Sequence, residues 1–399
     1  MSARHTDKSF VPIPIAEPEI QARALGVGFV GAQHPHITAR VRILEKDPRV
    51  RLVGFVEQDE ELASQVARRL SLKRYASLDE LLDDGLEIAI VEALDPDVPV
   101  LADACVGRVR AVLLEKPGAA VPDDLDGYVE RWSTSGTTFE FGYEMHYGMF
   151  MTHLRQLLSS GCLGQVTLAR LHGGCPVGCA LELWQSLPED LGGLGYTEGC
   201  HLVELATDLF GLPDGVSALS VKLPSGEPFL SPYFKSSLFS ESGGGTTVQV
   251  GTCAYEDVVT MTLVYPKRLV TIDLTAWESG NWVQDWGIQI YGTNGTVDVA
   301  VGAERVRLVL REARGGFSAG ETVLDAGQSG LGYMYERQLD SLLRRAVGEP
   351  VDEAVDLAAG LGVLQVLAAL YRSANASGAL CALQPASAER HHGEVAVRS

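Results

Sequence analysis

The sequence feature that most constrains the fold is an alternation of short aliphatic runs with amphipathic stretches through the first third of the chain. The aliphatic runs, each short enough for one buried strand, are residues 25–30, 52–56, 88–91, 109–114 and 139–141. In the first gap Ile37, Val41 and Leu44 recur at helical spacing, which indicates one buried helix face. Strands that alternate with helices in this way are typical of βαβ units. We therefore expect an α/β fold whose N-terminal part is a doubly wound parallel sheet.

The second half of the chain has a different pattern. Threonines alternate with aliphatic residues in segments 166–171, 246–253, 258–264 and 270–275, which is typical of a sheet with one face in water. The pair Asn294-Gly295 lies between two strand-like segments and predicts a β-hairpin, and helical spacing occurs at 149–160, 334–347 and 354–376. We predict an extended leader at residues 1–22, a first domain at 23–142, a second α/β domain at 143–376 and a flexible tail at 377–399.

Composition and charge exclude several classes of partner. The 52 acidic side chains outnumber the 32 basic ones, so the net charge is −20. A field of that sign repels phosphate backbones and anionic lipid heads, which argues against nucleic acid and membrane surfaces. Apolar runs fall short of the roughly 20 residues that span a bilayer, and the first residues lack the apolar segment of a secretory signal. Seven scattered cysteines, an odd number, suit reduced thiols, and we expect a cytoplasmic protein.

The first strand leads into a turn that could hold a dinucleotide. The string from Gly26 to Gly31 matches the glycine fingerprint, but its first part lies inside the strand, so the turn should begin at Gly31. In this register Gln33 and His36 replace the second and third glycines, and Pro35 is placed for a first helical position. The N-terminus of the following helix would still offer free N–H groups to an anion.

The second strand ends in an acid, Glu57, 26 positions after Gly31. A carboxylate at this place accepts hydrogen bonds from both ribose hydroxyls of NAD and repels the 2′-phosphate of NADP. Because residue 58 is Gln rather than Arg, NAD is favoured over NADP. The alternative is that Glu57 only solvates a strand end and that Gly31 only makes a tight turn.

A charged pair and a proline, Glu115-Lys116-Pro117, follow a buried strand directly. Ligands of open parallel sheets bind at the carboxyl ends of strands. A lysine there can hold a substrate hydroxyl and stabilise an alkoxide as a proton leaves, while Glu115 fixes the lysine. The alternative is a capped strand with a surface ion pair.

Two groups of histidines and cysteines have the residue types of metal ligands, but the spacing of neither is typical of a metal site. The segment from His172 to Cys179 lacks a second, similar pair of ligands, and His34 and His36 lack helical spacing. We therefore expect no metal. The first segment is instead interpreted as a glycine-rich loop, where Trp184 could contact a sugar face or simply pack.

The sequence resembles the glucose-fructose oxidoreductase/inositol dehydrogenase (Gfo/Idh/MocA) family over most of residues 24–376. The resemblance rests on the Gly31 turn, the acid at Glu57, the Glu115-Lys116-Pro117 motif and segments 160–166, 192–201 and 290–295. It implies an N-terminal Rossmann domain and a C-terminal α/β domain whose large, mostly antiparallel open sheet often serves in homo-oligomer contacts. It also implies NAD(P)-dependent redox chemistry on sugars, cyclitols or related polyols.

The resemblance assigns roles to particular residues. Lys116 and His201 would flank the reacting carbon, with His201 taking the hydroxyl proton and Lys116 steadying the oxygen. The other residues that we expect in the site are Gly31, Gln33, His34, Glu57, Asp95 and Glu115 at the cofactor, and His146, Trp184, Thr197 and Glu198 at the substrate.

The chain departs from the family pattern near the reacting groups. Thr197 stands where the family usually has the aspartate that assists the histidine, His146 replaces an arginine, and Asp95 lies in an altered loop after the fourth strand. We expect an NAD-dependent oxidoreductase that interconverts a secondary alcohol and a ketone on a sugar-like metabolite. Two alternatives are redox-neutral elimination or epimerisation assisted by NAD, and a non-catalytic protein that senses NAD or a sugar.

Overall fold

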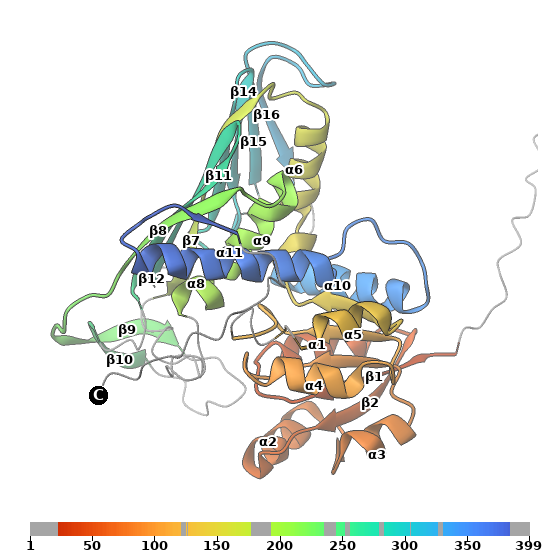
Figure 1. The fold of residues 1–399 in the computed structure, drawn as a ribbon. Helices are drawn as coiled ribbons and strands as arrows, with labels where there is room; N and C mark the ends of the chain where they lie inside the picture. The colour runs from red at the N-terminus through yellow and green to blue at the C-terminus, as the bar shows by residue number, and fades with distance from the viewer. Residues whose placement is uncertain are drawn as a thin grey trace, which may run out of the picture.

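The computed structural model describes most of the chain (Figure 1). The predicted leader at 1–22, Trp184 and residues 384–399 of the predicted tail lie outside the described residues. The described residues are 23–120, 125, 127–176, 193–234, 245–251, 256–278, 283–303, 305–325 and 330–383.

The N-terminal part is a six-stranded parallel sheet in the order β3-β2-β1-β4-β5-β6, which confirms the predicted doubly wound arrangement. The strand order reverses between β1 and β4, and the carboxyl ends of these two strands mark the place where such sheets bind ligands. The short strand β3 was not predicted. The strands are β1 (Leu25–Val30), β2 (Val50–Val56), β3 (Arg74–Tyr75), β4 (Ile88–Val91), β5 (Ala111–Leu114) and β6 (Thr138–Phe141).

Helices cover both faces of this sheet, as expected for crossover connections (Figure 1). The first helix buries Ile37, Val41 and Leu44, as the spacing predicts. It begins at Ile37, so Pro35 lies in the preceding turn and the prediction of a first helical position for it is wrong. The helices are α1 (Ile37–Leu44), α2 (Glu60–Leu70), α3 (Leu78–Asp83), α4 (Val98–Cys105) and α5 (Val129–Thr134).

The C-terminal part contains a nine-stranded sheet in the order β16-β15-β14-β13-β7-β12-β11-β8-β17, in which only β7 and β12 pair in parallel. The predicted hairpin at Asn294-Gly295 is the connection between β13 and β14. Strand β17 pairs with β8, so part of the segment that we expected to be a flexible tail belongs to the sheet. The strands are β7 (Val166–Pro176), β8 (Gly215–Val221), β11 (Val258–Tyr265), β12 (Arg268–Glu278), β13 (Gly287–Gly292), β14 (Gly295–Ala300), β15 (Arg305–Leu310), β16 (Gly320–Asp325) and β17 (Cys381–Ala382). A separate two-stranded sheet pairs β9 (Pro228–Phe234) with β10 (Gly245–Gln249).

Helices cover one face of the nine-stranded sheet. Along β12, Val270, Ile272 and Leu274 are buried whereas Leu269 and Asp273 are exposed, so one face is packed and the other faces solvent, as the alternation predicts. The elements beside the packed face are α6 (Met149–Ser159), α8 (Leu194–Thr197), α9 (Gly199–Phe210) and α11 (Leu357–Asn375), and a short 3₁₀ helix, η2 (Glu144–Tyr147), precedes α6.

Helix α11 is long and apolar enough to cross a membrane by length and composition alone. Half of its most apolar window is buried against α9, β8 and β6, and Figure 1 shows it lying across the middle of the molecule. Its apolar side chains therefore belong to the core that joins the two sheets.

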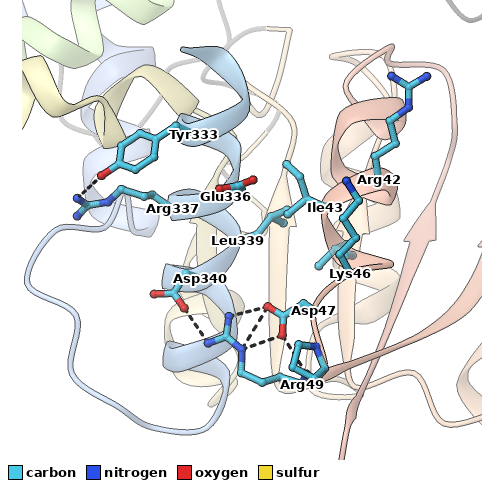
Figure 2. Close-up of a pocket in the computed structure, with 12 residues that line it drawn as sticks. Arg42, Ile43, Lys46, Asp47, Arg49, Tyr333, Glu336, Arg337, Leu339 and Asp340 are labelled. Carbon is cyan, nitrogen blue, oxygen red and sulfur yellow. Dashed lines mark hydrogen bonds and ion pairs between the residues drawn. The ribbon is translucent and has the colours of Figure 1, made fainter. Parts of the chain in front are cut away.

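Helix α10 (Leu331–Ala346) returns the chain to the first sheet and packs against α1, where Leu339 and Leu342 share a core with Val41. Figure 2 shows the pocket of about 580 Å³ between the end of α1 and α10. At its base Arg49 donates hydrogen bonds to Asp47 and, at 2.7 Å, to Asp340. The predicted cofactor residues lie elsewhere, after the carboxyl ends of the parallel strands.

Candidate functional site

The two predicted catalytic residues are brought to the same buried region. Lys116 is the second residue after β5, which ends at Leu114, and His201 lies in the first turn of α9. Each side chain is about 4% exposed. Lys116 Nζ bonds to the carbonyl oxygen of Thr197, and His201 follows Thr197 by about one helical turn, so the two side chains belong to the same region. The fold thus joins two residues 85 positions apart in the sequence (201 − 116).

Lys116 is held by the backbone of the second half of the chain. Its Nζ donates a hydrogen bond of 2.6 Å to the carbonyl oxygen of Thr197, and the Lys116–Pro117 peptide bond is cis. Burial disfavours the charged ammonium, but acidic neighbours including Glu198 and Glu115 outweigh burial and raise the pKa of Lys116. The residue is therefore a fixed cation at neutral pH.

His201 is held by aromatic rings. Tyr143 and Trp286 approach the imidazole edge-on, with ring centroids 5.8 and 6.0 Å away. Burial and then the charge of Lys116 lower the pKa of His201 well below 6.5, so the ring is neutral at pH 7. A neutral imidazole is the form that can accept a proton.

Several buried polar atoms around this pair have no hydrogen-bond partner among the described residues. They are His201 Nδ1, the Tyr143 hydroxyl and Glu144 Oε2. Buried polar atoms are normally satisfied, so a group of unsatisfied ones indicates the place of a polar ligand. Tyr143 and Glu144 follow β6, which adds the end of a third parallel strand to the site.

The helix that carries His201 is interrupted at Glu198, between α8 and α9. Thr197 is buried and its hydroxyl donates to the carbonyl oxygen of Gly193, so this side chain is used within its own helical turn. The charge of Glu198 acts on Lys116, whose pKa it raises. The carboxylate at position 198 therefore supports the lysine, and the aspartate that usually assists the histidine has no direct substitute at Thr197.

His146 lies in η2 and is buried beside α9. Its Nδ1 is 2.7 Å from Glu204 Oε1, and the guanidinium of Arg155 lies 3.0 Å from Nε2. Burial lowers the pKa of His146, but Glu204 outweighs burial, and the net shift is upward. Both ring nitrogens thus have protein partners. His146, which we expected at the substrate, is part of a buried group of charged side chains with Glu204 and Arg155.

The Gly31 turn has the backbone form expected for a cofactor loop. Gly31 has φ of 76°, and a Cβ there would lie 3.1 Å from the carbonyl oxygen of Glu92, so glycine is required. Glu57 accepts hydrogen bonds from the N–H groups of Ala32 and Asp59, both at 2.9 Å, and is nearly buried. Each carboxylate oxygen keeps a second lone pair, so the residues present fit a ribose at this strand end.

The rest of the loop is closed by its own contacts. Gln33 accepts a hydrogen bond of 2.9 Å from the N–H of Leu94, which ties the turn after β1 to the segment after β4. The N–H groups of Gln33 and His34 both donate to the carbonyl oxygen of Glu92. Asp95, the next predicted cofactor residue, is fully buried beyond Leu94. The N–H groups of Gln33 and His34 are thus used by a backbone carbonyl oxygen, and the Gln33 side chain holds the neighbouring loop.

A buried ionic cluster lies beneath this turn. One nitrogen of Arg40 donates to Glu92 and to Glu115, each at 2.6 Å, and all three side chains are fully buried. His36 Nδ1 lies 3.0 Å from the other oxygen of Glu115, and His34 Nδ1 lies 3.7 Å from that same oxygen. Burial raises the pKa of Glu92 to about 7, and Arg40 opposes the rise. Glu115, the residue before Lys116, is therefore held at one carboxylate oxygen by Arg40 and at the other by His36.

Both parts of the chain match domains of one protein family. Residues 24–143 match the NAD-binding Rossmann-fold domain of the GFO/IDH/MocA oxidoreductase family, and residues 151–298 match a C-terminal domain of the same family. The chain belongs to the Gfo/Idh/MocA family. Within the curated proteins, an uncharacterized oxidoreductase of Schizosaccharomyces pombe is 28% identical over 148 residues, which are 36% of this chain and 40% of that protein.

Solved structures of similar fold cover nearly the whole Gfo/Idh/MocA chain. An oxidoreductase of Agrobacterium radiobacter in complex with NAD⁺, L-tartaric acid and magnesium has a TM-score of 0.72 and 15% identity, over 90% of this chain and 98% of that one. The WlbA dehydrogenase of Bordetella pertussis in complex with NADH and UDP-GlcNAcA has a TM-score of 0.71 and 17% identity, over 92% and 99%. A Desulfitobacterium hafniense protein described as an NADPH-dependent oxidoreductase has a TM-score of 0.70 and 15% identity, over 89% and 96%. At these identities the likeness shows the fold.

Sequence reasoning missed several residues that shape this Gfo/Idh/MocA site. Tyr143 and Glu144 could have been found, because they directly follow a predicted strand of the parallel sheet. Arg40 also left a signal, since it lies on the buried face of the first helix together with Ile37. No sequence pattern indicated Trp286, because its proximity to His201 depends on the packing of α9 beside β12 and β7.

Proposed function

We propose that this protein is an NAD-dependent oxidoreductase that transfers a hydride between nicotinamide and a secondary alcohol or ketone of a sugar, cyclitol or sugar-like metabolite. The observation that carries this proposal is the burial of a cationic lysine beside a neutral histidine, with unsatisfied polar atoms around them. Neighbours of the same fold bind L-tartaric acid or UDP-GlcNAcA, which are hydroxy acids or sugar derivatives. Their chemistry supports a polyol substrate.

In such a reaction, side chains of the site would bind the substrate oxygen and accept the hydroxyl proton. In the oxidation direction, Lys116 donates a charge-assisted hydrogen bond to the substrate hydroxyl oxygen and stabilises the negative charge that develops there. The neutral imidazole of His201 accepts the hydroxyl proton, and the C–O bond becomes a carbonyl. When bound, NAD supplies the acceptor of the hydride. Tyr143 and Trp286 keep the imidazole ring in place.

A test of this function needs only the full-length protein, NAD and a panel of polyols and hydroxy acids. We expect at least one panel member to produce reduced nicotinamide, measured by its absorbance. Tight NAD binding without reduction across the panel would contradict net oxidation and favour either redox-neutral chemistry or a sensor. Conversion of a panel member without reduced nicotinamide, followed by chromatography, would favour the redox-neutral alternative.

Glu57 is proposed to hold the ribose of NAD and to select it over NADP. We expect Glu57→Ala to weaken NAD binding roughly 10–100-fold, since a hydrogen bond to a charged group contributes about 1.5–3 kcal/mol. NADP binding should change less, because the lost carboxylate also repelled the 2′-phosphate. Titration calorimetry with both cofactors measures the effect, and Glu61→Ala in α2, where the side chain is exposed, is the control. Unchanged NAD affinity would overturn the assignment.

The pH dependence of oxidation follows from His201. Because its pKa in the folded protein lies well below 6.5, the ring is already neutral there, and protonation removes the base only at lower pH. Lys116 and His36 lower this pKa and Glu115 raises it. We expect kcat/KM for alcohol oxidation to stay constant from neutrality down to about pH 6.5 and to fall below it. An acidic limb with a midpoint above 6.5 would contradict a neutral, buried base.

We also propose that the protein forms a homo-oligomer through the solvent-facing side of the nine-stranded sheet. On that side Leu168, Leu269 and Tyr291 lie next to one another in register on β7, β12 and β13, and Leu269 is 45% exposed. An apolar row on an open sheet face is typical of a protein interface. Leu269→Glu is expected to lower the mass in sedimentation velocity experiments, while Leu331→Glu, exposed at the start of α10, should not. Equal masses of the unaltered protein, Leu269→Glu and Leu331→Glu would refute this interface.

A further inference from the structure

Tyr143 carries a buried hydroxyl group that the fold does not use. The side chain is fully buried, and its hydroxyl oxygen has no hydrogen-bond partner among the described residues. A hydroxyl that is taken out of water without gaining a partner lowers the stability of the folded state. Phenylalanine would fill the same space without this cost. We therefore expect the hydroxyl to bind a group that is not part of the protein.

The contacts of Tyr143 place it beside both predicted catalytic residues. The N–H of Gly142, the preceding residue, donates to the carbonyl oxygen of Leu114 at 2.7 Å, which joins the segment after β6 to the end of β5, just before Lys116. On its other side, the ring of Tyr143 meets the imidazole of His201 edge-on, with 5.8 Å between the centroids. Because the ring contacts the imidazole, its hydroxyl lies near the reacting carbon of a substrate and not near a remote part of it.

Two other buried aromatic side chains of this region have polar atoms that the fold does use. Trp286 lies against the same imidazole, and its Nε1 donates to the carbonyl oxygen of Gly174 at 3.0 Å. Tyr147 lies in η2, and its hydroxyl donates to Glu140 Oε1 at 2.6 Å. Among these three side chains, Tyr143 is the one whose polar atom the described residues leave without a partner.

The hydroxyl of Tyr143 keeps its proton. Burial, and to a smaller extent acidic neighbours such as Glu204 and Asp95, raise the pKa of Tyr143 well above 10. A phenol that stays protonated can donate a hydrogen bond but cannot act as a base. The proton acceptor of the proposed reaction therefore remains His201, and the role left to Tyr143 is to bind.

The unused atoms beside Lys116 and His201 include a donor and an acceptor. The Tyr143 hydroxyl can donate, and Glu144 Oε2, on the next residue, is a buried carboxylate oxygen without a partner among the described residues. A substrate hydroxyl both donates and accepts, whereas a substrate carboxylate only accepts. A ligand with several hydroxyl groups therefore complements these atoms better than a carboxylate does.

We propose that the Tyr143 hydroxyl donates a hydrogen bond to the substrate hydroxyl on the carbon next to the reacting one, so that the site selects substrates with two neighbouring hydroxyl groups. This inference rests on the proposed function and narrows its substrate class to vicinal diols of sugars or cyclitols. A site built to hydrogen-bond a substrate hydroxyl discriminates against an analogue that lacks it, because the buried group of the protein is then left unpaired.

The first measurement is urea unfolding of the full-length protein without ligands. Tyr143→Phe removes one unsatisfied oxygen, so we expect its midpoint to equal or exceed that of the unaltered protein. Tyr147→Phe is the matched control, and its midpoint should fall because the buried carboxylate of Glu140 loses a donor. If the midpoint of Tyr143→Phe falls as far as that of Tyr147→Phe, the hydroxyl has a partner in the folded protein, and the proposal is overturned.

The second measurement compares the best polyol substrate of the panel with its analogue that lacks the hydroxyl next to the reacting carbon. For D-glucose the analogue is 2-deoxy-D-glucose, and for myo-inositol it is a deoxyinositol. In Tyr143→Phe we expect kcat/KM for the polyol to fall about 3–10-fold, the effect of one neutral hydrogen bond, and kcat/KM for the analogue to stay the same. The preference for the polyol over the analogue should thus shrink by that factor, whereas Tyr147→Phe should retain it.

The outcomes separate this inference from the proposed function. If Tyr143 only supports the fold, Tyr143→Phe lowers kcat/KM for both compounds alike and leaves the preference unchanged, which contradicts the substrate contact but not hydride transfer. Absence of oxidation for every polyol would contradict the proposed function and this inference together. The urea midpoints are independent of turnover and decide in either case whether the protein itself uses the hydroxyl.

Discussion

Lys116→Met is expected to lower kcat of the proposed oxidation by roughly 10²–10³-fold, the effect of removing one donor from a developing oxyanion. Methionine keeps the length of the side chain but cannot hydrogen-bond the substrate oxygen. His201→Asn should lower kcat as well, because it removes the base while keeping a polar side chain of similar size. Steady-state kinetics on the best panel substrate measure both effects.

The control for this pair is Lys46→Met. Lys46 is exposed and lines the pocket between α1 and α10, so the same substitution there should leave kcat unchanged. Circular dichroism and the urea midpoint separate a loss of chemistry from a loss of fold, since Lys116→Met also leaves the buried carbonyl oxygen of Thr197 without its donor. If Lys116→Met or His201→Asn retains more than about a tenth of kcat with a native fold, the lysine–histidine mechanism is wrong.

The sequence was most informative where local pattern decides structure. The parallel sheet, the turn at Gly31 and the hairpin at Asn294 follow from aliphatic runs, glycine geometry and turn chemistry, and the structure confirms all three. Strand β15 was missed because Arg305 and Arg307 occupy its solvent-facing positions and break the threonine–aliphatic pattern of the other strands. Strand β17 was missed because two residues form it, and their pairing with β8 is purely long-range.

The candidate site was predictable only in part, for a physical reason. Lys116 and His201 were identified by family motifs, and the fold places them together in the buried site. The groups that fix them depend on contacts between distant segments. Arg40 bonds to Glu92, 52 positions away, and to Gln338, 298 positions away. No local spacing encodes such contacts, although an arginine on an apolar helix face is a usable sign of a buried partner.

Arg40→Met is expected to destabilise the protein by about 3–5 kcal/mol, the cost of removing one partner from a buried ion pair. The reason is that Arg40 is the guanidinium that bridges Glu92 and Glu115, all three side chains being fully buried. Without it, two carboxylates lie side by side in the core beneath the Gly31 turn. Arg42→Met is the matched control, because Arg42 is exposed on the same helix and should change stability by less than about 0.5 kcal/mol.

The assignment of this cost to the buried carboxylates can be tested with a double substitution. If Arg40 stabilises the fold by compensating Glu92, then Glu92→Gln in the Arg40→Met background should restore part of the lost stability, whereas Glu92→Gln alone should destabilise. Urea unfolding of the four proteins gives the coupling free energy between the two side chains. Additive effects would mean that Arg40 acts through packing against Tyr335, whose ring lies 5.7 Å from the guanidinium, and not through its charge.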